Sequence, residues 1–353
     1  MKKFQEYIRR VEPYTPGEQP QASNLIKLNT NENPYPPSPK AVEALKEMDM
    51  DRLRLYPDPQ ATVLTSALAD YYGVDKEQVF VGVGSDDVLG MAFLTFFNSD
   101  LPILFPDITY SFYDVWANLY RIPFACPALD ENFRINPEDY KRPNGGVVIT
   151  NPNAPTGICE PLSFIEKILS YNEDSLVIVD EAYIDFGGES ALSLVNRYDN
   201  LLVVQTFSKS RSMAGMRIGF AIGNKELIRA MNDVKFSYNS YTMNQTSLAV
   251  GKASILDNAY FEECCRKIIH TREHTKEELE KLGFSCTDSA TNFLFATHRD
   301  IPAETIFEAL KAKNIFVRYF KKPRIDNYLR ITIGTDEEME VLLRELKQII
   351  VHK

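Results

Sequence analysis

The chain has 353 residues, of which 44% are hydrophobic and 25% charged, and its formal net charge is −10. These proportions are typical of a globular protein long enough to form two domains. The acidic balance, without a clustered basic stripe, argues against nucleic acid or an anionic membrane as a partner. The N-terminus lacks the apolar stretch of a secretion signal, and no apolar run reaches the ~18 residues that span a bilayer. We therefore expect a cytoplasmic protein.

The first 40 residues are expected to form an extended arm. Residues 13–39 are rich in proline and asparagine, and prolines at 34, 36, 37 and 39 exclude a helix. This segment is predicted to run extended over a surface, as an N-terminal lid (1–40) that packs with a smaller domain. A first helix is predicted from Pro39 and a second through ATVLTSALADYY, ending at Gly73.

The middle of the chain alternates short apolar strands with helical patterns. The predicted strands are QVFVGVG, PILFPD, GGVVITNP, LVIVDEAY, LLVVQTFSK and RIGFAIG. They are continuous apolar runs, which is typical of parallel strands covered on both faces. The order strand, crossover, strand predicts an α/β fold with a doubly wound, mostly parallel sheet as the large domain, 41–255.

The C-terminal part is predicted to form a smaller α+β domain, 256–353. Residues 245–283 read as one long helix or a broken pair. Strand patterns follow in TNFLFATH, IFVRYF and YLRITIGT, and a last helix is predicted over 336–351.

Four predicted strand ends carry polar residues. Gly82-Val83-Gly84-Ser85 opens a helix, NPNAPTG follows the strand GGVVIT, Asp180-Glu181-Ala182-Tyr183 follows LVIV, and Ser208-Lys209 follows LLVVQT. Each alone could be a turn, a cap or a solvated side chain. Because the carboxyl ends of strands in an open α/β sheet meet at one edge, we expect the four to converge on a ligand.

The chemistry of this set points to one cofactor. The glycine turn at a helix N-terminus offers backbone N–H groups to a phosphate, and Ser208 and Arg217 add a hydroxyl and a guanidinium. Lys209 can attack an aldehyde, and Asp180 can hold a proton on a ring nitrogen. A phosphate, an aldehyde and a protonated pyridine together indicate pyridoxal 5′-phosphate.

Ten motifs in chain order carry a resemblance over the whole chain: PYTPG, KLNTNENPYPP, LYPDPQ, GVGSDDVL, ITYSFY, NPNAPTG, VDEAY, TFSKSRSMAGMRIGF, TNFLFA and YLRITIGT. In these the chain resembles the fold type I pyridoxal-phosphate aminotransferases. The resemblance implies a homodimer with shared active sites and a ping-pong transamination. It is strongest to members that act on histidinol phosphate with glutamate and 2-oxoglutarate, in histidine biosynthesis. Aromatic amino-acid aminotransferases and threonine-phosphate decarboxylases share nearly all these motifs and remain alternatives.

The resemblance also implies roles for individual residues. Lys209 would form the Schiff base, Asp180 would face the pyridine nitrogen and Tyr183 the phenolic oxygen, and these three are the predicted catalytic residues. The implied cofactor-binding residues are Ser85, Asp86, Tyr110, Asn153, Asp180, Tyr183, Thr206, Ser208, Lys209, Arg217 and, from the neighbouring subunit, Tyr56. The implied substrate-binding residues are Tyr14, Asn31, Tyr238, Arg318 and Arg330, with Arg330 accepting a phosphate or a carboxylate.

One position departs from the family pattern. Directly before Pro-Thr-Gly, where the family usually has an asparagine on the cofactor's phenolic oxygen, this chain has Ala154. Asn153 is one residue early and would point elsewhere unless the loop shifts. Either Tyr183 makes this contact alone or Asn153 substitutes, and both alternatives stay open.

Interpretations from other classes have less support. A dinucleotide-dependent oxidoreductase would use Gly82-x-Gly84, but Asp87 stands where the third glycine belongs. A non-enzymatic ligand sensor usually needs a DNA-binding domain, and no basic segment is left for one. His270 and His274 are spaced i, i+4 but lack a third ligand, so no metal is expected.

Overall fold

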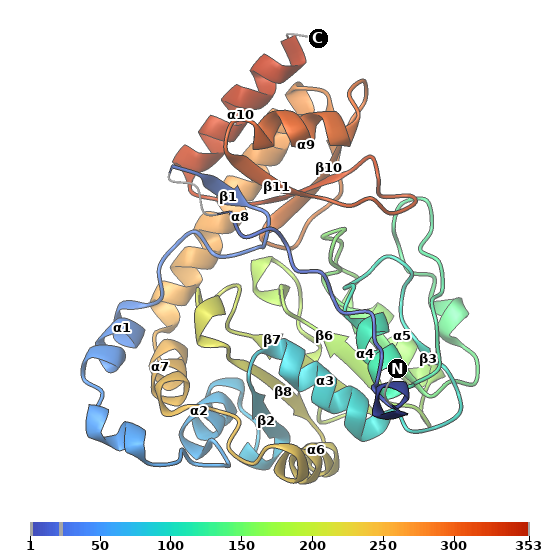
Figure 1. The fold of residues 1–353 in the computed structure, drawn as a ribbon, viewed down its shortest axis with the longest axis vertical. Helices are drawn as coiled ribbons and strands as arrows, with labels where there is room; N and C mark the ends of the chain where they lie inside the picture. Colours follow the sequence, from blue (N-terminus) through green and yellow to red (C-terminus); the bar gives the residue numbers. More distant parts are fainter. Residues whose placement is uncertain (1–2, 21–23, 352–353) are drawn as a thin grey trace.

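The structure, a computed structural model, describes residues 3–20 and 24–351, in which the strands form two sheets (Figure 1). The larger sheet has, in spatial order, β2 (Val79–Gly82), β8 (Gly219–Gly223), β7 (Leu201–Thr206), β6 (Val177–Asp180), β5 (Gly146–Thr150), β3 (Ile103–Leu104) and β4 (Phe124–Ala125). The smaller has β1 (Ile26–Leu28), β11 (Ile315–Tyr319), β12 (Leu329–Thr332), β10 (Phe293–His298) and β9 (Phe284–Cys286).

Helices surround both sheets. The α-helices are α1 (Pro39–Lys46), α2 (Thr62–Tyr72), α3 (Ser85–Phe96), α4 (Tyr113–Tyr120), α5 (Leu162–Tyr171), α6 (Lys225–Tyr238), α7 (Gln245–Ile255), α8 (Asn258–Lys281), α9 (Ala303–Lys311) and α10 (Asp336–Val351). Short 3-10 turns lie at Lys3–Glu6, Met50–Arg54, Lys76–Gln78, Pro137–Tyr140, Ile184–Phe186, Ala191–Leu194 and Ala214–Met216. Within the described residues, no helix combines the length and apolarity needed to cross a membrane.

The larger sheet is buried on both faces, which explains its continuous apolar strands. In β5, Val147 and Ile149 pack in one hydrophobic cluster and Val148 packs in another on the opposite face. Because successive side chains of a strand point to opposite faces, a strand covered on both sides must be apolar throughout. The predicted α/β fold with a doubly wound, mostly parallel sheet is confirmed.

Strand β8 is the antiparallel member of this sheet and pairs with both β7 and β2. It therefore begins at the edge where β7 and β2 end. The connection from β7 carries Lys209 and returns through Arg217, whose backbone adopts a left-handed conformation with φ 52°. This reversal brings Arg217 and Gly219 to the edge of the sheet at which ligands bind.

Within the N-terminal segment, residues 26–28 form a strand of the smaller sheet, where the sequence predicted only an extended arm over a surface. Strand β1 pairs in parallel with β11, with Ile26 opposite Ile315 and Leu28 opposite Val317, and Leu28 is only 1% exposed. The three-residue pattern Ile-Lys-Leu was too short to stand out among prolines and asparagines. The first strand is therefore part of the sheet formed otherwise by the C-terminal third of the chain.

The predicted helix boundaries agree well with the structure. Helix α1 begins at Pro39, and α2 ends before Gly73, whose φ of 67° makes it a left-handed C-cap. The helical region 245–283 is a broken pair, α7 and α8. The larger sheet and its helices form one body of the molecule, and the smaller sheet with its helices forms the other. Figure 1 shows α8 running from the larger body, beside α7, to the smaller body, which contains β1, β11 and α10.

Gly219 makes a close backbone contact that can be tested. A Cβ at this position would lie 2.3 Å from Gly84 C and from Ser85 N, whereas a Cβ at Gly215 would meet nothing within 4 Å. We expect Gly219→Ala to lower the free energy of unfolding by about 1–3 kcal/mol, because backbone atoms must move apart. Gly215→Ala is the matched control, with an expected change within ~0.5 kcal/mol. Equal denaturant midpoints for the two variants would contradict this assignment.

Candidate active site

A pocket of about 150 Å³ lies between the two bodies at the predicted edge of the large sheet. Its lining includes seven of the residues predicted from sequence: Tyr14, Asn31, Tyr110, Tyr183, Lys209, Arg318 and Arg330. Residues from both bodies therefore meet around Lys209, although they are separated by up to 316 positions in the chain. Ala154 lines the same pocket.

Lys209 is held by the N-terminal segment. Its Nζ donates to the Thr30 carbonyl at 3.3 Å and lies 5.7 Å from the centre of the Tyr183 ring. The Asn33 side-chain amide donates to the carbonyls of Lys209 and Ser210, at 3.0 and 3.2 Å. Neither Thr30 nor Asn33 was among the predicted site residues. The polar run NTNENP was the signal that this segment contacts other polar groups.

Asp180 is a buried carboxylate at the end of β6. Its Oδ2 accepts a hydrogen bond from Tyr113 Oη at 2.7 Å, and its Oδ1 accepts one from the Ala182 N–H at 3.2 Å. Burial raises the pKa of Asp180 to about 6, and the two hydrogen bonds offset only part of that effect. Tyr113 was not predicted as a site residue, although it lies in the motif ITYSFY. A cationic ring nitrogen placed against this carboxylate would favour its charged form.

The N-terminus of α3 forms a cradle for an anion. Its N-cap is Gly84, which supplies no side-chain cap, and a Cβ at Gly84 would lie 2.5 Å from Arg217 Nη2. The guanidinium therefore lies directly over the free end of the helix, whose first residues are Ser85 and Asp86. Ser208 is buried on the loop that follows β7 and accepts a hydrogen bond from Thr206 Oγ1 at 3.0 Å. Helix N–H groups, a hydroxyl and a guanidinium are the donors that suit a phosphate.

The side chain of Asp86 has contacts that the sequence did not predict. Its carboxylate accepts from Tyr110 Oη at 2.8 Å and pairs with Arg217 Nη2 at 3.1 Å. Burial, followed by the neighbouring Asp86 charge, raises the pKa of Tyr110 well above its usual value. Only the backbone of Asp86 had been assigned to the phosphate. An anion entering the cradle must therefore compete with this carboxylate for Arg217.

Two arginines face one another across β11 and β12. Arg318 lies directly opposite Arg330 in the strand register, and both line the pocket. Arg330 Nη2 donates to the Asn29 carbonyl at 3.0 Å, while its buried Nε has no hydrogen-bond partner among the described residues. Burial, reinforced by Arg318, lowers the pKa of Arg330 below its usual value. Like charges directly opposite one another destabilise a sheet, and an anion between them would offset this cost.

Nine predicted site residues do not line this pocket: six at the neighbouring strand ends and in the cradle (Ser85, Asp86, Asp180, Thr206, Ser208 and Arg217), and Asn153, Tyr56 and Tyr238. The Asn153 amide donates to the Ile108 carbonyl and to Thr156 Oγ1, both at 3.0 Å, and so it braces its own loop. Tyr56 and Tyr238 are 81% and 76% exposed, and neither lines the pocket. The Tyr56 ring stacks on Tyr241, with 4.6 Å between centroids.

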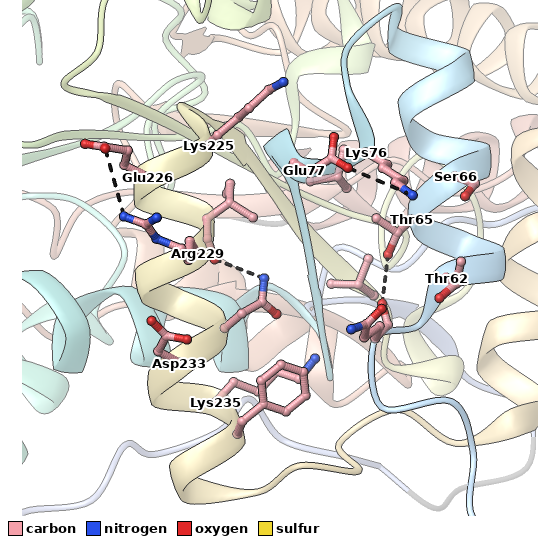
Figure 2. A pocket seen from close by; sticks show the side chains of 16 residues that line it. Thr62, Thr65, Ser66, Lys76, Glu77, Lys225, Glu226, Arg229, Asp233 and Lys235 are labelled. Carbon is pink, nitrogen blue, oxygen red and sulfur yellow. Dashed lines mark hydrogen bonds and ion pairs between the residues drawn. The ribbon is translucent and has the colours of Figure 1, made fainter.

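A larger groove of about 570 Å³ lies between α2 and α6, and Figure 2 shows the side chains that line it. None of the residues predicted from sequence lines it. Its charges are largely balanced within the groove, since Lys76 pairs with Glu77 and Arg229 with Glu226. The buried Lys235 donates to the Pro59 carbonyl at 2.9 Å. Size alone therefore does not identify the site, and the convergent polar groups of the smaller pocket do.

Comparison with known proteins agrees with this geometry. The family model described as "Aminotransferase class I and II" matches residues 23–346. The chain belongs to this aminotransferase family. Its fold is that of the fold type I pyridoxal-phosphate aminotransferases, and pyridoxal phosphate is the cofactor of the family.

Curated relatives of this aminotransferase cover nearly its whole length. It is 54% identical over 351 residues to a Clostridium botulinum (strain Langeland) protein named histidinol-phosphate aminotransferase, covering 99% of each chain. It is 54% identical to an Acinetobacter baumannii (strain AYE) protein of the same name, covering 98% of this chain and 96% of the relative. The structure of histidinol-phosphate aminotransferase from Sinorhizobium meliloti, in complex with pyridoxal-5′-phosphate, matches with a TM-score of 0.83 at 23% identity, covering 93% and 91%.

The raised pKa of Asp180 predicts a pH dependence of stability in the ligand-free aminotransferase. Stability from a carboxyl whose folded pKa lies near 6 is fully present below the unfolded value of about 4, and it is lost as the pH rises through 6. In the Asp180→Asn variant, residue 180 cannot titrate. The difference in free energy of unfolding, variant minus parent, should therefore increase by about 2 kcal/mol from pH 4.5 to pH 7.5.

Urea unfolding of cofactor-stripped protein at several pH values measures this difference. The raised pKa of Glu181, to about 7, affects both proteins and cancels in the comparison. A parent–variant difference that stays constant over this range would show that Asp180 is ionised in the folded protein throughout.

Proposed function

We propose that this chain catalyses the pyridoxal-phosphate-dependent transfer of an amino group from histidinol phosphate to 2-oxoglutarate, giving imidazole acetol phosphate and glutamate. The observation that carries the proposal is one pocket lined by Lys209 and two arginines, with no acidic side chain among its described lining residues. The identity of 54% over nearly the full length of relatives with this named activity supports the choice of substrate.

The residues present fit the cofactor. The α3 N-terminus with Ser85, Asp86, Ser208 and Arg217 would hold its phosphate, and Tyr110 lines the pocket above the neighbouring strand ends. Asp180 is the carboxylate available to a ring nitrogen, and Tyr183 Oη is the hydroxyl available to the phenolic oxygen. When bound, the cofactor supplies an electron-withdrawing ring that accepts the electrons left at the substrate α-carbon.

The chain's own residues carry the proton transfer and the binding. Lys209 is the lysine among the residues that line the pocket, and its Nζ takes the proton from the substrate α-carbon. Arg330 and Arg318 bind the anionic end of each substrate in turn, a phosphate in one half-reaction and a carboxylate in the other. A guanidinium binds both groups through paired N–H donors, so one site serves a ping-pong cycle.

The experiment that tests this function is a spectroscopic one with a matched pair of variants. Purified holoenzyme mixed with histidinol phosphate should convert the absorbance of the bound cofactor to that of its aminated form. Lys209→Ala should lower kcat at least about a thousandfold, because the base and nucleophile are removed, while the surface variant Lys167→Ala should retain the parent rate. Multiple turnovers by Lys209→Ala would refute the role of this lysine. A spectral response to threonine phosphate or aromatic amino acids, without one to histidinol phosphate, would refute the substrate.

We further propose a homodimer in which Tyr56 reaches the cofactor phosphate of the partner's site. Large apolar side chains are exposed on two segments, 50–56 and 236–241, and include Met50, Leu53, Leu55, Tyr56, Phe236, Tyr238 and Tyr241. The Tyr56–Tyr241 stack and hydrogen bonds from Gln245 to the carbonyls of Arg52 and Leu55 hold the first segment in place beside α7. Such a patch is typical of an interface between chains.

Subunit mixing tests the shared site. Tyr56→Ala and Lys209→Ala should each be nearly inactive alone. Hybrid dimers formed by co-expression contain one site with neither change, so random pairing should restore about a quarter of the parent sites. Sites formed within single chains would show no such recovery.

A further inference from the structure

Ala154 gives the pocket no side-chain amide at this position, and the neighbouring Asn153 does not supply one in its place. Ala154 lines the pocket with a methyl group. Both amide hydrogens of Asn153 are used, one by the Ile108 carbonyl and one by Thr156 Oγ1, and its Oδ1 accepts from Thr109 Oγ1 at 2.9 Å. Turning Asn153 toward the pocket would break all three hydrogen bonds. A hydrogen-bond donor on this side of the pocket must therefore come from another residue.

Asn31 also lines the pocket, contacts Tyr183 and is itself buried, with 1% of its surface exposed. Its Nδ2 lies 2.9 Å from Tyr183 Oη, and its Oδ1 lies 2.9 Å from Thr332 Oγ1. Its carbonyl accepts from the Asn292 amide at 3.0 Å. The backbone of Asn31 is left-handed, with φ 58°, a conformation that asparagine tolerates better than most residues. Asn31 is therefore fixed in place by contacts on its backbone and its side chain.

The hydrogen bonds of Thr332 agree with the way the Asn31 amide points. Thr332 Oγ1 accepts from the Asn31 backbone N–H at 3.1 Å, and its single hydrogen is then given to Asn31 Oδ1. With Oδ1 on Thr332, the amide nitrogen faces Tyr183. Because an amide nitrogen can only donate, Tyr183 Oη accepts this bond and keeps its own hydrogen for another acceptor.

We propose that Asn31 is a positioning residue that directs the Tyr183 hydroxyl hydrogen into the pocket, and that this relay replaces the amide contact absent at Ala154. The inference rests on the proposed function, in which the acceptor is the phenolic oxygen of pyridoxal phosphate. The donated bond also polarises the Tyr183 O–H, which makes it a stronger donor. Tyr183 makes the contact with the cofactor, and Asn31 acts through it.

Asn31→Asp tests the direction of the bond. Aspartate keeps the shape of the side chain and tolerates the left-handed backbone, but it presents an acceptor to Tyr183 in place of the donor. Tyr183 then donates to residue 31 and no longer into the pocket. A donor to the phenolic oxygen favours the unprotonated form of the bound chromophore, so its loss should raise the pH midpoint of the holoenzyme's absorbance by about one unit.

Two further variants separate the hydrogen bond from the added charge. Asn31→Gly removes the amide without a charge and suits φ 58°, so it should shift the midpoint in the same direction by a smaller amount. In a Tyr183→Phe background there is no hydroxyl to direct, and the uncharged change Asn31→Gly should then shift the midpoint by less than ~0.3 unit. Unfolding midpoints of the cofactor-stripped variants establish that each one is folded.

The outcomes distinguish this inference from the function on which it rests. Midpoints raised in both Asn31 variants, and insensitive to Asn31→Gly once Tyr183 is phenylalanine, would support the relay. Unchanged midpoints, or a shift that persists in the Tyr183→Phe background, would overturn it while leaving the aminotransferase assignment intact. A parent protein that forms no chromophore with added pyridoxal phosphate would overturn the proposed function instead.

Discussion

Asp180 and Arg330 are ionisable side chains that the fold removes from water without giving either one an ion-pair partner among the described residues. Asp180 accepts hydrogen bonds from a phenol and a backbone N–H, and Arg330 donates to a backbone carbonyl. Burying an uncompensated charge costs several kcal/mol, and so the rest of the structure must supply that stability. The doubly covered sheet does so through its hydrophobic clusters. A cation placed against Asp180 and an anion placed against Arg330 would each offset one of these costs.

Residues 29–33 join the two halves of the site. The Asn29 carbonyl accepts a hydrogen bond from Arg330, and the Thr30 carbonyl accepts one from Lys209. The Asn31 side chain hydrogen-bonds to both Tyr183 and Thr332. The Asn33 amide donates to the backbone carbonyl of Lys209. Lys209 and Tyr183 come from the large sheet, whereas Arg330 and Thr332 lie on β12. A segment of five residues thus contacts both Lys209 and Arg330, the residues proposed for the chemistry and for binding substrate anions. Strand β1, just before it, anchors this segment to the second sheet.

The predictable features were those that depend on local pattern. Continuous apolar runs identified the buried strands, Pro39 and Gly73 marked helix ends, and polar strand ends located Lys209 and Asp180. The features that escaped prediction depend on contacts between distant residues. The Asp86 carboxylate reaches Arg217 across 131 positions, and Tyr113 reaches Asp180 across 67. Strand β1 was missed because its stability comes from pairing with β11 and not from its own three residues.

Residue type and strand periodicity are local properties, and they were enough to establish the order of the elements, the chemistry gathered at one edge of a sheet, and the lysine at its centre. The resemblance to the aminotransferase family raised the further question of what compensates for Ala154. Its answer required the folded chain, in which Asn153 braces its own loop and Asn31 faces Tyr183, since these outcomes depend on side-chain directions and on segments 152 positions apart. Hydrogen bonds are directional and short, so a change in backbone placement of about an ångström decides whether they form at all.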